Sequence, residues 1–186
     1  MKKLSLLIYL IFLSPNIVLS EAVEIYALNQ LDEYRGYCLD IKGHKLKART
    51  NKGLQAHTCY SYQGEIAVDQ GFDSLKLSQN QFFLPAFDVC MEAASVSTSA
   101  PIKLSTCNSS TLQKFEWDTR GRVHPISDRK LCVTIAQGQS RKGGGGSPVH
   151  LIRNLSLEPC SDTLRPYQLW GARTVSYTHL TLPTKA

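Results

Sequence analysis

Asp40, Gln55 and His57 are polar residues in two short stretches where polar and apolar residues alternate. Asp40 lies between Leu39 and Ile41, and Gln55 and His57 alternate with small or apolar neighbours. Because strand side chains alternate between two faces, we expect these three to share the outward surface of two neighbouring strands. A carboxylate on such a surface can accept hydrogen bonds from ligand hydroxyl groups, and charge-assisted bonds of this kind are strong.

Six cysteines divide the chain into three units with the same order of features. Each unit has two cysteines followed by a Gln-x-aromatic step: Cys38, Cys59 and Gln70-Gly71-Phe72; Cys90, Cys107 and Gln113-Lys114-Phe115; Cys132, Cys160 and Gln168-Leu169-Trp170. None of the spacings is the C-x-x-C of a zinc or redox motif. Six cysteines allow 15 pairings, and the repeated order selects 38–59, 90–107 and 132–160. Each bridge would stabilise the fold by roughly 3 kcal/mol.

The two ends of the chain differ from the part between them. Residues 1–20 combine Lys2 and Lys3, an apolar run from Leu4 to Leu13 and small residues before the expected cleavage, which is typical of a secretory signal peptide. Residues 175–186 resemble the in-frame translation of a transposase adapter used in sequencing libraries, so we predict that this tail is not native. A few native residues should follow Arg173 instead.

Residues 21–174 then form one domain. Without Lys2, Lys3 and Lys185, the 21 basic residues become 18 against 15 acidic ones, a net charge of +3. This modest balance gives no case for a nucleic-acid ligand. Short apolar alternations with frequent turn residues, and no helical apolar stripe, indicate an all-β sandwich or barrel.

The units Cys-Leu-Asp-Ile, Leu-Gln-Ala-His-Thr-Cys and Asp-Gln-Gly-Phe resemble the repeats of ricin-type lectins. The stretch from Trp117 to Cys132 resembles that family's connection between repeats. The resemblance implies a β-trefoil of three repeats, at about 24–72, 73–117 and 118–174, each with one internal disulfide. Phe replaces Trp at two of the three aromatic steps, and it should still fill a core position.

The resemblance also implies a sugar site in the first repeat. The acidic residue of the family's sugar site corresponds to Asp40, and the polar residue beside it corresponds to Gln55. Asp69 and Gln70 match the family's polar pair at the Gln-x-aromatic step. His57 stands where the family has a stacking aromatic ring, and nearby Tyr60 or Tyr62 could supply that ring. Each residue also has a structural interpretation: Asp40 as a solvated charge, His57 as a surface residue, Asp69 as a turn cap and Gln70 as a backbone partner.

The other two repeats lack a matching polar set. The second has Glu92 but Lys103 and Ser105 in place of the amide and the ring, and the third has Thr134, Ser156 and Glu158. We therefore expect both to be structural. The third repeat also contains GQSRKGGGGSPVH, which predicts a flexible hairpin loop tethered by the Cys132–Cys160 bridge.

These observations predict a secreted or periplasmic carbohydrate-binding protein whose ligand is a galactose-type or other sugar, with a separate toxin or enzyme chain as a possible partner. The alternative is a β-trefoil that acts as a protein-interaction or inhibitor scaffold without a sugar site. No nucleophile motif, metal-ligand spacing or paired acids stand out, so we expect no enzyme activity and no cofactor. No apolar stretch beyond the signal peptide predicts a transmembrane segment.

Overall fold

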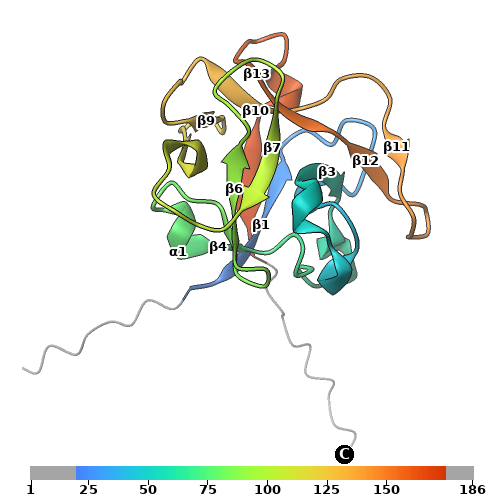
Figure 1. Cartoon of the computed structure of the whole chain (residues 1–186). Helices are drawn as coiled ribbons and strands as arrows, with labels where there is room; N and C mark the ends of the chain where they lie inside the picture. The colour runs from blue at the N-terminus through green and yellow to red at the C-terminus, as the bar shows by residue number, and fades with distance from the viewer. Residues whose placement is uncertain (1–19, 175–186) are drawn as a thin grey trace, which may run out of the picture.

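Short strands separated by turns make up most of residues 20–174, the part of the chain that the computed structural model describes (Figure 1). The predicted signal peptide, apart from Ser20, and the predicted non-native tail lie outside these residues. The only α-helix between residues 20 and 174 has four residues, so the all-β prediction is confirmed. None of the helices in this part of the chain has the length and apolar character needed to cross a membrane.

Each repeat supplies the four strands of a trefoil unit, and the third adds two more. The first repeat contains β1 (Ala22–Ala27), β2 (Tyr37–Ile41), β3 (Leu54–Thr58) and β4 (Phe72–Asp73), with 3-10 turns at Lys45–Lys47, Thr50–Lys52 and Tyr60–Gln63. The second contains α1 (Ser74–Leu77), β5 (Phe83–Leu84), β6 (Val89–Ala93), β7 (Ala100–Ser105), a 3-10 turn at Thr111–Gln113 and β8 (Phe115–Trp117). The third contains β9 (Val123–Pro125), β10 (Leu131–Ile135), β11 (Arg141–Lys142), β12 (Leu151–Arg153), β13 (Leu155–Pro159), a 3-10 turn at Arg165–Tyr167 and β14 (Trp170–Arg173).

The strands form three antiparallel sheets. One sheet has the order β11-β12-β3-β2-β1-β14, with β4 also paired to β1; a second has the order β10-β13-β7-β6-β5; and β8 pairs with β9. The first and last strands pair along four positions, from Glu24 with Arg173 to Ala27 with Trp170. The expected closure of the last strand against the first is therefore present.

The core consists of the apolar positions that alternate along these strands. In the first repeat Leu39, Ile41, Leu54 and Ala56 are buried, and the matching positions of the other repeats are buried as well: Met91, Ala93, Ile102, Leu104, Val133, Ile135, Leu155 and Leu157. The aromatic steps Phe72, Phe115 and Trp170 are also buried, and each such side chain contributes about 1.5–3 kcal/mol. The prediction that these positions face inward is confirmed.

Three disulfides close one loop in each repeat. The bridges are Cys38–Cys59, Cys90–Cys107 and Cys132–Cys160, and no described cysteine is free. The pairing selected from the repeated order of the sequence is confirmed. A domain of this size with three bridges is typical of an oxidising compartment.

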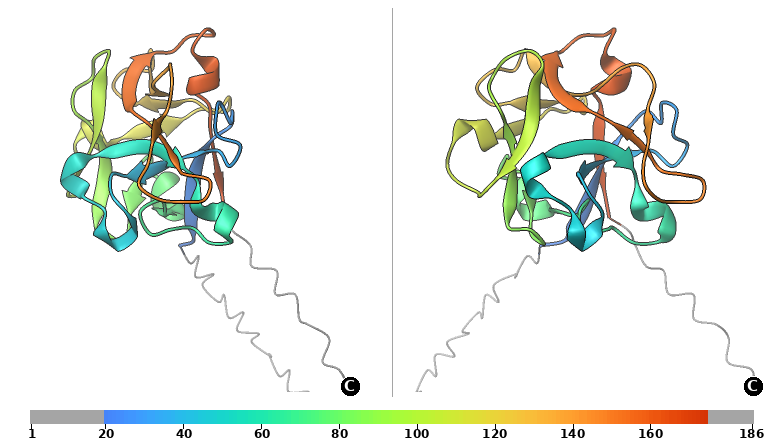
Figure 2. Two further views of the ribbon diagram at one scale, coloured as in Figure 1. Left: turned by 90° about the vertical axis from the view of Figure 1, so that its right-hand side faces the viewer. Right: turned by 45° about the vertical axis from the view of Figure 1, so that its right-hand side comes forward.

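The insertion in the third repeat forms a hairpin that lies on the first repeat. Strand β11 pairs with β12, and β12 continues the sheet by pairing with β3, where Ile152 lies opposite His57. One residue beyond β12, strand β13 pairs with β10 of its own repeat. Figure 2 shows this orange hairpin beside the cyan strands of the first repeat. The pairing brings residues 143–150 over the polar face of β2 and β3.

Candidate functional site

The glutamine of each Gln-x-aromatic step makes the same three kinds of hydrogen bond. Its Nε2 donates to the residue two positions after the first cysteine, over 3.0 Å for Gln70 to Asp40, 2.8 Å for Gln113 to Glu92 and 3.0 Å for Gln168 to Thr134. Nε2 also donates to the carbonyl just before the second cysteine: Thr58, Thr106 or Pro159. Its Oε1 accepts from the amide just after that cysteine: Tyr60, Asn108 or Ser161.

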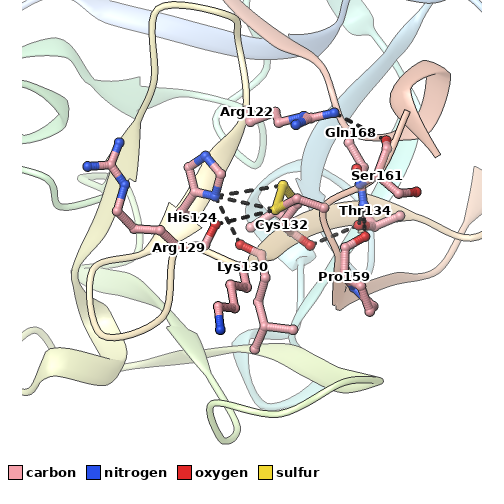
Figure 3. The surroundings of a disulfide bond; sticks show 12 residues. Arg122, His124, Arg129, Lys130, Cys132, Thr134, Pro159, Ser161 and Gln168 are labelled. Atoms are coloured by element: carbon pink, nitrogen blue, oxygen red, sulfur yellow. Dashed lines mark hydrogen bonds between the residues drawn. A yellow bond between two sulfur atoms is a disulfide. The ribbon is translucent and has the colours of Figure 1, made fainter. Parts of the chain in front are cut away.

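This arrangement explains why the three glutamines are fully buried. A buried amide is tolerated only when its donors and acceptor have partners, and here each amide links two strands beside a disulfide. Figure 3 shows the case of Gln168, with Thr134, Pro159 and Ser161 around the Cys132–Cys160 bridge. The side chain of Gln70 therefore has the structural role of its two counterparts.

In the first repeat the network extends to Gln55. Asp40 and Gln55 are cross-strand partners, and Gln55 donates a hydrogen bond of 2.8 Å to Asp40. The expectation that Asp40, Gln55 and His57 share one face is consistent with this geometry. The expectation that this face is outward is wrong, because the three residues are only 1%, 5% and 5% exposed. The segment around Tyr60 and the hairpin of the third repeat cover the face.

Asp69 lies at the edge of the same network. Its Oδ2 accepts a hydrogen bond from the backbone amide of Lys45, and its backbone carbonyl accepts one from Ile41 over 3.0 Å. Its Oδ1 has no hydrogen-bond partner among residues 20–174. Asp69 thus holds the turn after β2 against the end of the first repeat, in line with the turn-cap interpretation.

Burial changes the ionisation of both acids. Loss of hydration raises the pKa of Asp40 well above its ordinary value of 3.8, and the nearby charge of Asp69 raises it further, against the opposing hydrogen bonds from Gln55 and Gln70. Burial also raises the pKa of Asp69. An acid in this environment is easily held neutral, and neither carboxylate lines an open surface.

An open pocket of about 570 Å³ lies above this network. Its lining residues come from the first repeat and from the hairpin: Gly43, His44, Lys45, His57, Tyr60, Gln63, Gly144, Gly145, Gly146 and His150. Of the five residues predicted for a sugar site, only His57 lines it. Asp40, Gln55, Asp69 and Gln70 lie beneath its floor.

Three rings form the apolar part of the pocket wall. His57 stacks on Tyr60 with ring centroids 5.3 Å apart, and His150 meets each of them edge-on at 5.1 Å. Tyr60 thus places a ring beside His57, the residue that occupies the position predicted for a stacking aromatic ring. Tyr62 is more exposed and bonds to Nε2 of His150 over 2.8 Å.

His57 is a hydrogen-bond acceptor at neutral pH. Its Nδ1 lies 2.9 Å from the carbonyl of Thr58, so this nitrogen carries the proton, and Nε2 has no hydrogen-bond partner among residues 20–174. Burial lowers the pKa of His57 to about 4, and the carbonyl bond only partly offsets this. The free Nε2 can therefore accept a bond from a ligand hydroxyl.

The hairpin is held in place by bonds to the first repeat. Arg35 donates to the carbonyls of Pro148 over 2.8 Å and Val149 over 3.0 Å, while Glu33 holds its guanidinium. The amide of Leu151 donates to Oγ1 of Thr58 over 2.8 Å. Residues 144–146 are exposed beyond these bonds. No pattern in the sequence predicts that this hairpin completes a pocket on another repeat.

The matching positions of the other repeats form no such pocket wall. Glu92 bonds to Gln113 and lies 3.4 Å from the ammonium of Lys103. Thr134 bonds to Gln168 and to the carbonyl of Cys132. The acid and the hydroxyl at these positions are therefore engaged within the protein.

Two groups of potential metal ligands occur between residues 20 and 174. His124 lies beside Cys132 and Cys160, and Glu24 beside Cys38 and Cys59. In both groups the sulfur atoms belong to disulfides. Since the thiolate is the form that binds metal, neither group is a candidate metal centre.

A concentration of positive charge beside the pocket was missed by the interpretation of the sequence. The segment from Lys42 to Lys52 contains five Lys or Arg residues and no acid. A count of charges in a short window would have found it, whereas the net charge of the domain hides it.

Comparison with known proteins agrees with this architecture. Among solved structures, a non-toxic homologue of type II RIPs from Momordica charantia (bitter gourd), in complex with α-methyl-D-galactoside, shares 15% identity at a TM-score of 0.57, over 83% of this chain and 48% of that one. The earthworm R-type lectin C-half in complex with GalNAc shares 17% identity at a TM-score of 0.55, over 82% and 98%. The Vibrio vulnificus hemolysin/cytolysin β-trefoil lectin with N-acetyl-D-lactosamine shares 16% at a TM-score of 0.51, over 84% and 96%.

The chain spans about half the length of the bitter gourd protein. The TM-scores above 0.5 establish a common fold with these three structures. No curated protein matches the sequence. The profile of the ricin-type beta-trefoil lectin domain matches residues 27–170, which cover all three disulfides and all three Gln-x-aromatic steps. The chain belongs to the ricin-type beta-trefoil lectin domain family.

Proposed function

We propose that this protein is a secreted or periplasmic lectin that binds a sugar in the pocket of the first repeat. The observation that supports this most is the position of the pocket, directly above the Asp40 network and bounded by the rings of His57, Tyr60 and His150. A flat ring packs against the apolar face of a sugar, while neighbouring polar groups bond to its hydroxyls. The ligand is a galactose-type or other sugar.

The five predicted site residues divide into two roles in this proposal. His57 contacts the sugar through its ring and its free Nε2. Asp40, Gln55, Asp69 and Gln70 hold the floor of the pocket, because their side chains are buried and most of their polar atoms are bonded to one another or to the backbone. Their substitution should act on binding by moving Tyr60 and the turn at Lys45.

The first repeat is the preferred location because its polar cluster lies beside a pocket bounded by the rings of His57 and Tyr60. In the second repeat Lys103 and Gln113 engage Glu92, and in the third Gln168 engages Thr134. One shallow site binds a monosaccharide with a Kd of about 1 mM. Tighter binding to a glycan-coated surface would require several copies of the lectin acting together. A separate toxin or enzyme chain is a candidate partner of the lectin.

The second candidate function is a protein-interaction or inhibitor scaffold without a sugar site and without catalysis. The buried state of Asp40 and Gln55 favours it, because no acidic side chain is open to a ligand in the pocket. A scaffold would bind its partner through exposed residues, and blocking the pocket would have no effect on that binding.

A glycan array with a pocket-blocking variant distinguishes the two functions. Gly144 lines the pocket, and a Cβ added there meets no atom within 4 Å, so Gly144→Trp should fold and occlude the pocket. Ser127→Trp is the matched control at an exposed position outside the pocket. We expect the unmodified protein and the control to bind the same glycans and Gly144→Trp to lose them. Absence of glycan binding by the unmodified protein, or equal binding by both variants, would contradict the proposal.

A further inference from the structure

The segment from Lys42 to Lys52, here called the cationic loop, connects β2 to β3, and its residues 43–45 line the pocket. Its basic residues are Lys42, Lys45, Lys47, Arg49 and Lys52. Lys47, Arg49 and Lys52 are exposed. Lys45 forms an ion pair with Glu65 over 3.2 Å, whereas the other four form no ion pair with any residue between 20 and 174. The protein therefore leaves most of this charge uncompensated.

The hairpin of the third repeat adds to the same concentration of charge. Arg141 and Lys142 are exposed in β11, which lies two strands from β3 in the same sheet. Burial lowers the pKa of Lys42, and the positive charges of Arg141 and Lys52 lower it further. Cations from two repeats are thus close enough to repel one another, which costs stability that an anion would restore.

The cationic loop and the pocket share residues. His44 and Lys45 line the pocket, and they also line an adjoining groove of about 420 Å³ that contains Leu46 and Lys47. The pocket lining includes no acidic residue, and Asp40 and Asp69 are buried beneath it. The groove lining includes one acid, Glu65, which is paired with Lys45. A ligand residue in the pocket would therefore place its next substituent beside lysine side chains.

Exposed lysines are often no more than a solvated surface. These basic residues differ from an ordinary solvated surface in two ways. They come from two separate segments, and they lie near a pocket with three rings in its wall. Such a field attracts ligands of the opposite sign and favours them over neutral ones of the same shape.

We propose that the ligand of this protein is an acidic glycan, whose sugar ring occupies the pocket and whose carboxylate or sulfate groups lie on the cationic loop. This inference rests on the proposed sugar site and adds the chemical class of its ligand. Lys47, Arg49 and Lys52 hold the anionic groups, and Lys45 lies at the junction of pocket and groove. A nucleic acid or an anionic lipid surface would use the loop alone, because neither needs the pocket.

The test is an array on which each neutral oligosaccharide stands beside its carboxylated and its sulfated forms. The proteins are the unmodified chain, the triple variant Lys47→Gln/Arg49→Gln/Lys52→Gln and the control triple variant Lys76→Gln/Lys130→Gln/Arg165→Gln. The control residues are exposed and lie outside the pocket and the cationic loop, and both triple variants lose three positive charges. Binding is measured at about 0.05 M and about 0.5 M salt.

We expect the acidic member of a matched pair to bind about three- to tenfold more tightly than the neutral member at low salt, since each exposed charge pair adds a modest gain. The loop variant should lose this preference while its binding of the neutral member stays the same, and the control variant should keep it. High salt should reduce the preference. The carboxylated and sulfated arms identify which group the loop holds.

Equal binding of neutral and acidic members would overturn the inference, and so would an equal loss of preference in both triple variants. Tighter binding of a single-stranded DNA oligomer or of phosphatidylserine vesicles than of any acidic glycan would also overturn it. The Gly144→Trp variant separates this result from the proposed site. If it keeps the preference for acidic glycans that the loop variant loses, the pocket proposal fails while the ligand class stands. If no glycan of either kind binds, both fail.

Discussion

The side-chain amide of Gln70 donates a hydrogen bond to Asp40 over 3.0 Å, and the two residues are buried beneath the pocket. The pairs Gln113–Glu92 and Gln168–Thr134 repeat the same contact in the other repeats. A contact present in repeats without the pocket has a structural cause. The Gln-x-aromatic step therefore supplies two structural elements at once, a core ring and an amide that joins two strands next to a disulfide.

Gln113→Leu should lower the free energy of unfolding by about 2–4 kcal/mol, because the Asn108 amide, the Thr106 carbonyl and the Glu92 carboxylate each lose a hydrogen bond to the buried Gln113 side chain. Urea denaturation measures the change. Gln79→Leu is the matched control, since Gln79 is exposed and its side chain makes no hydrogen bond within residues 20–174, and it should change stability by less than about 0.5 kcal/mol. Similar effects of the two substitutions would show that the glutamine network is not a stabilising element.

Asp40→Asn should gain stability relative to the unmodified protein as the pH rises from about 4 to about 7. Burial raises the pKa of Asp40 in the folded chain, so the folded state binds its proton more tightly than the unfolded state does. The contribution of Asp40 to the free energy of unfolding therefore falls as the pH rises above 3.8. Asparagine removes this dependence and keeps an acceptor for Gln70, while the Gln55 amide can turn to accept from the new amide group.

Denaturation in urea at both pH values measures the difference. The Asp40→Ala variant provides the contrast, because it leaves the donors of Gln55 and Gln70 unpaired and should destabilise the fold at both values. A difference between Asp40→Asn and the unmodified protein that is the same at pH 4 and pH 7 would disprove the ionisation argument.

His57→Phe should make the protein less sensitive to acid. The folded pKa of about 4 lies below the ordinary value of 6.5, so the unfolded chain takes up a proton first, and stability is lost as the pH falls from 6.5 toward 4. This loss is up to about 3 kcal/mol. Phenylalanine keeps the stacking on Tyr60, and the Thr58 carbonyl keeps its bond from Gln70. Part of the acid sensitivity should persist, because burial also lowers the pKa of His150.

The measurement is the free energy of unfolding at intervals between pH 4 and pH 7 for the two proteins. We expect the profile of His57→Phe to be flatter over this range. Parallel profiles would mean that His57 binds its proton equally well in the folded and unfolded chain, and the conclusion that burial lowers its pKa would be withdrawn.

Arg35→Met should release the hairpin of the third repeat from the first. Arg35 donates to the carbonyls of Pro148 and Val149, and without it the amide of Leu151 should exchange faster with solvent. Hydrogen exchange of the peptide that contains Leu151 measures this effect. Arg165→Met is the control at an exposed position in another turn, and it should leave that exchange rate unchanged. Unchanged exchange in Arg35→Met would show that the hairpin is held by its strand pairing alone.

Most of the fold can be predicted from the sequence, whereas the shape of the site cannot, for a physical reason. The alternation at Leu39 and Ile41 and the spacing of the cysteines are local signals, and each predicted its outcome correctly. The cover over Asp40 is not local. The hairpin reaches the first repeat through contacts such as that between Leu151 and Thr58, 93 residues apart, and its glycines carry no apolar pattern that would reveal the pairing. The alternation along the strand therefore predicts that Asp40 is exposed.

The same limit applies to the sugar-site residues. The match with the family located Asp40, Gln55, His57, Asp69 and Gln70 in one cluster, and they do lie together. Which of them line the pocket depends on Tyr60 and His150, whose positions follow from tertiary packing. The sequence predicts Tyr60 or Tyr62 as the missing ring, because both lie near His57. His150 had no such signal.

The central claim is that a sugar binds in the pocket formed by the first repeat and the third-repeat hairpin. An NMR titration with the best ligand from the array, following the backbone amides, tests it most directly. The account predicts that the shifts gather at residues 43–45, at Tyr60 and Gln63, and at residues 144–146 and His150, with little change near Glu92 or Thr134. Shifts that gather around Glu92 and Lys103 instead, or no shifts at all, would contradict it.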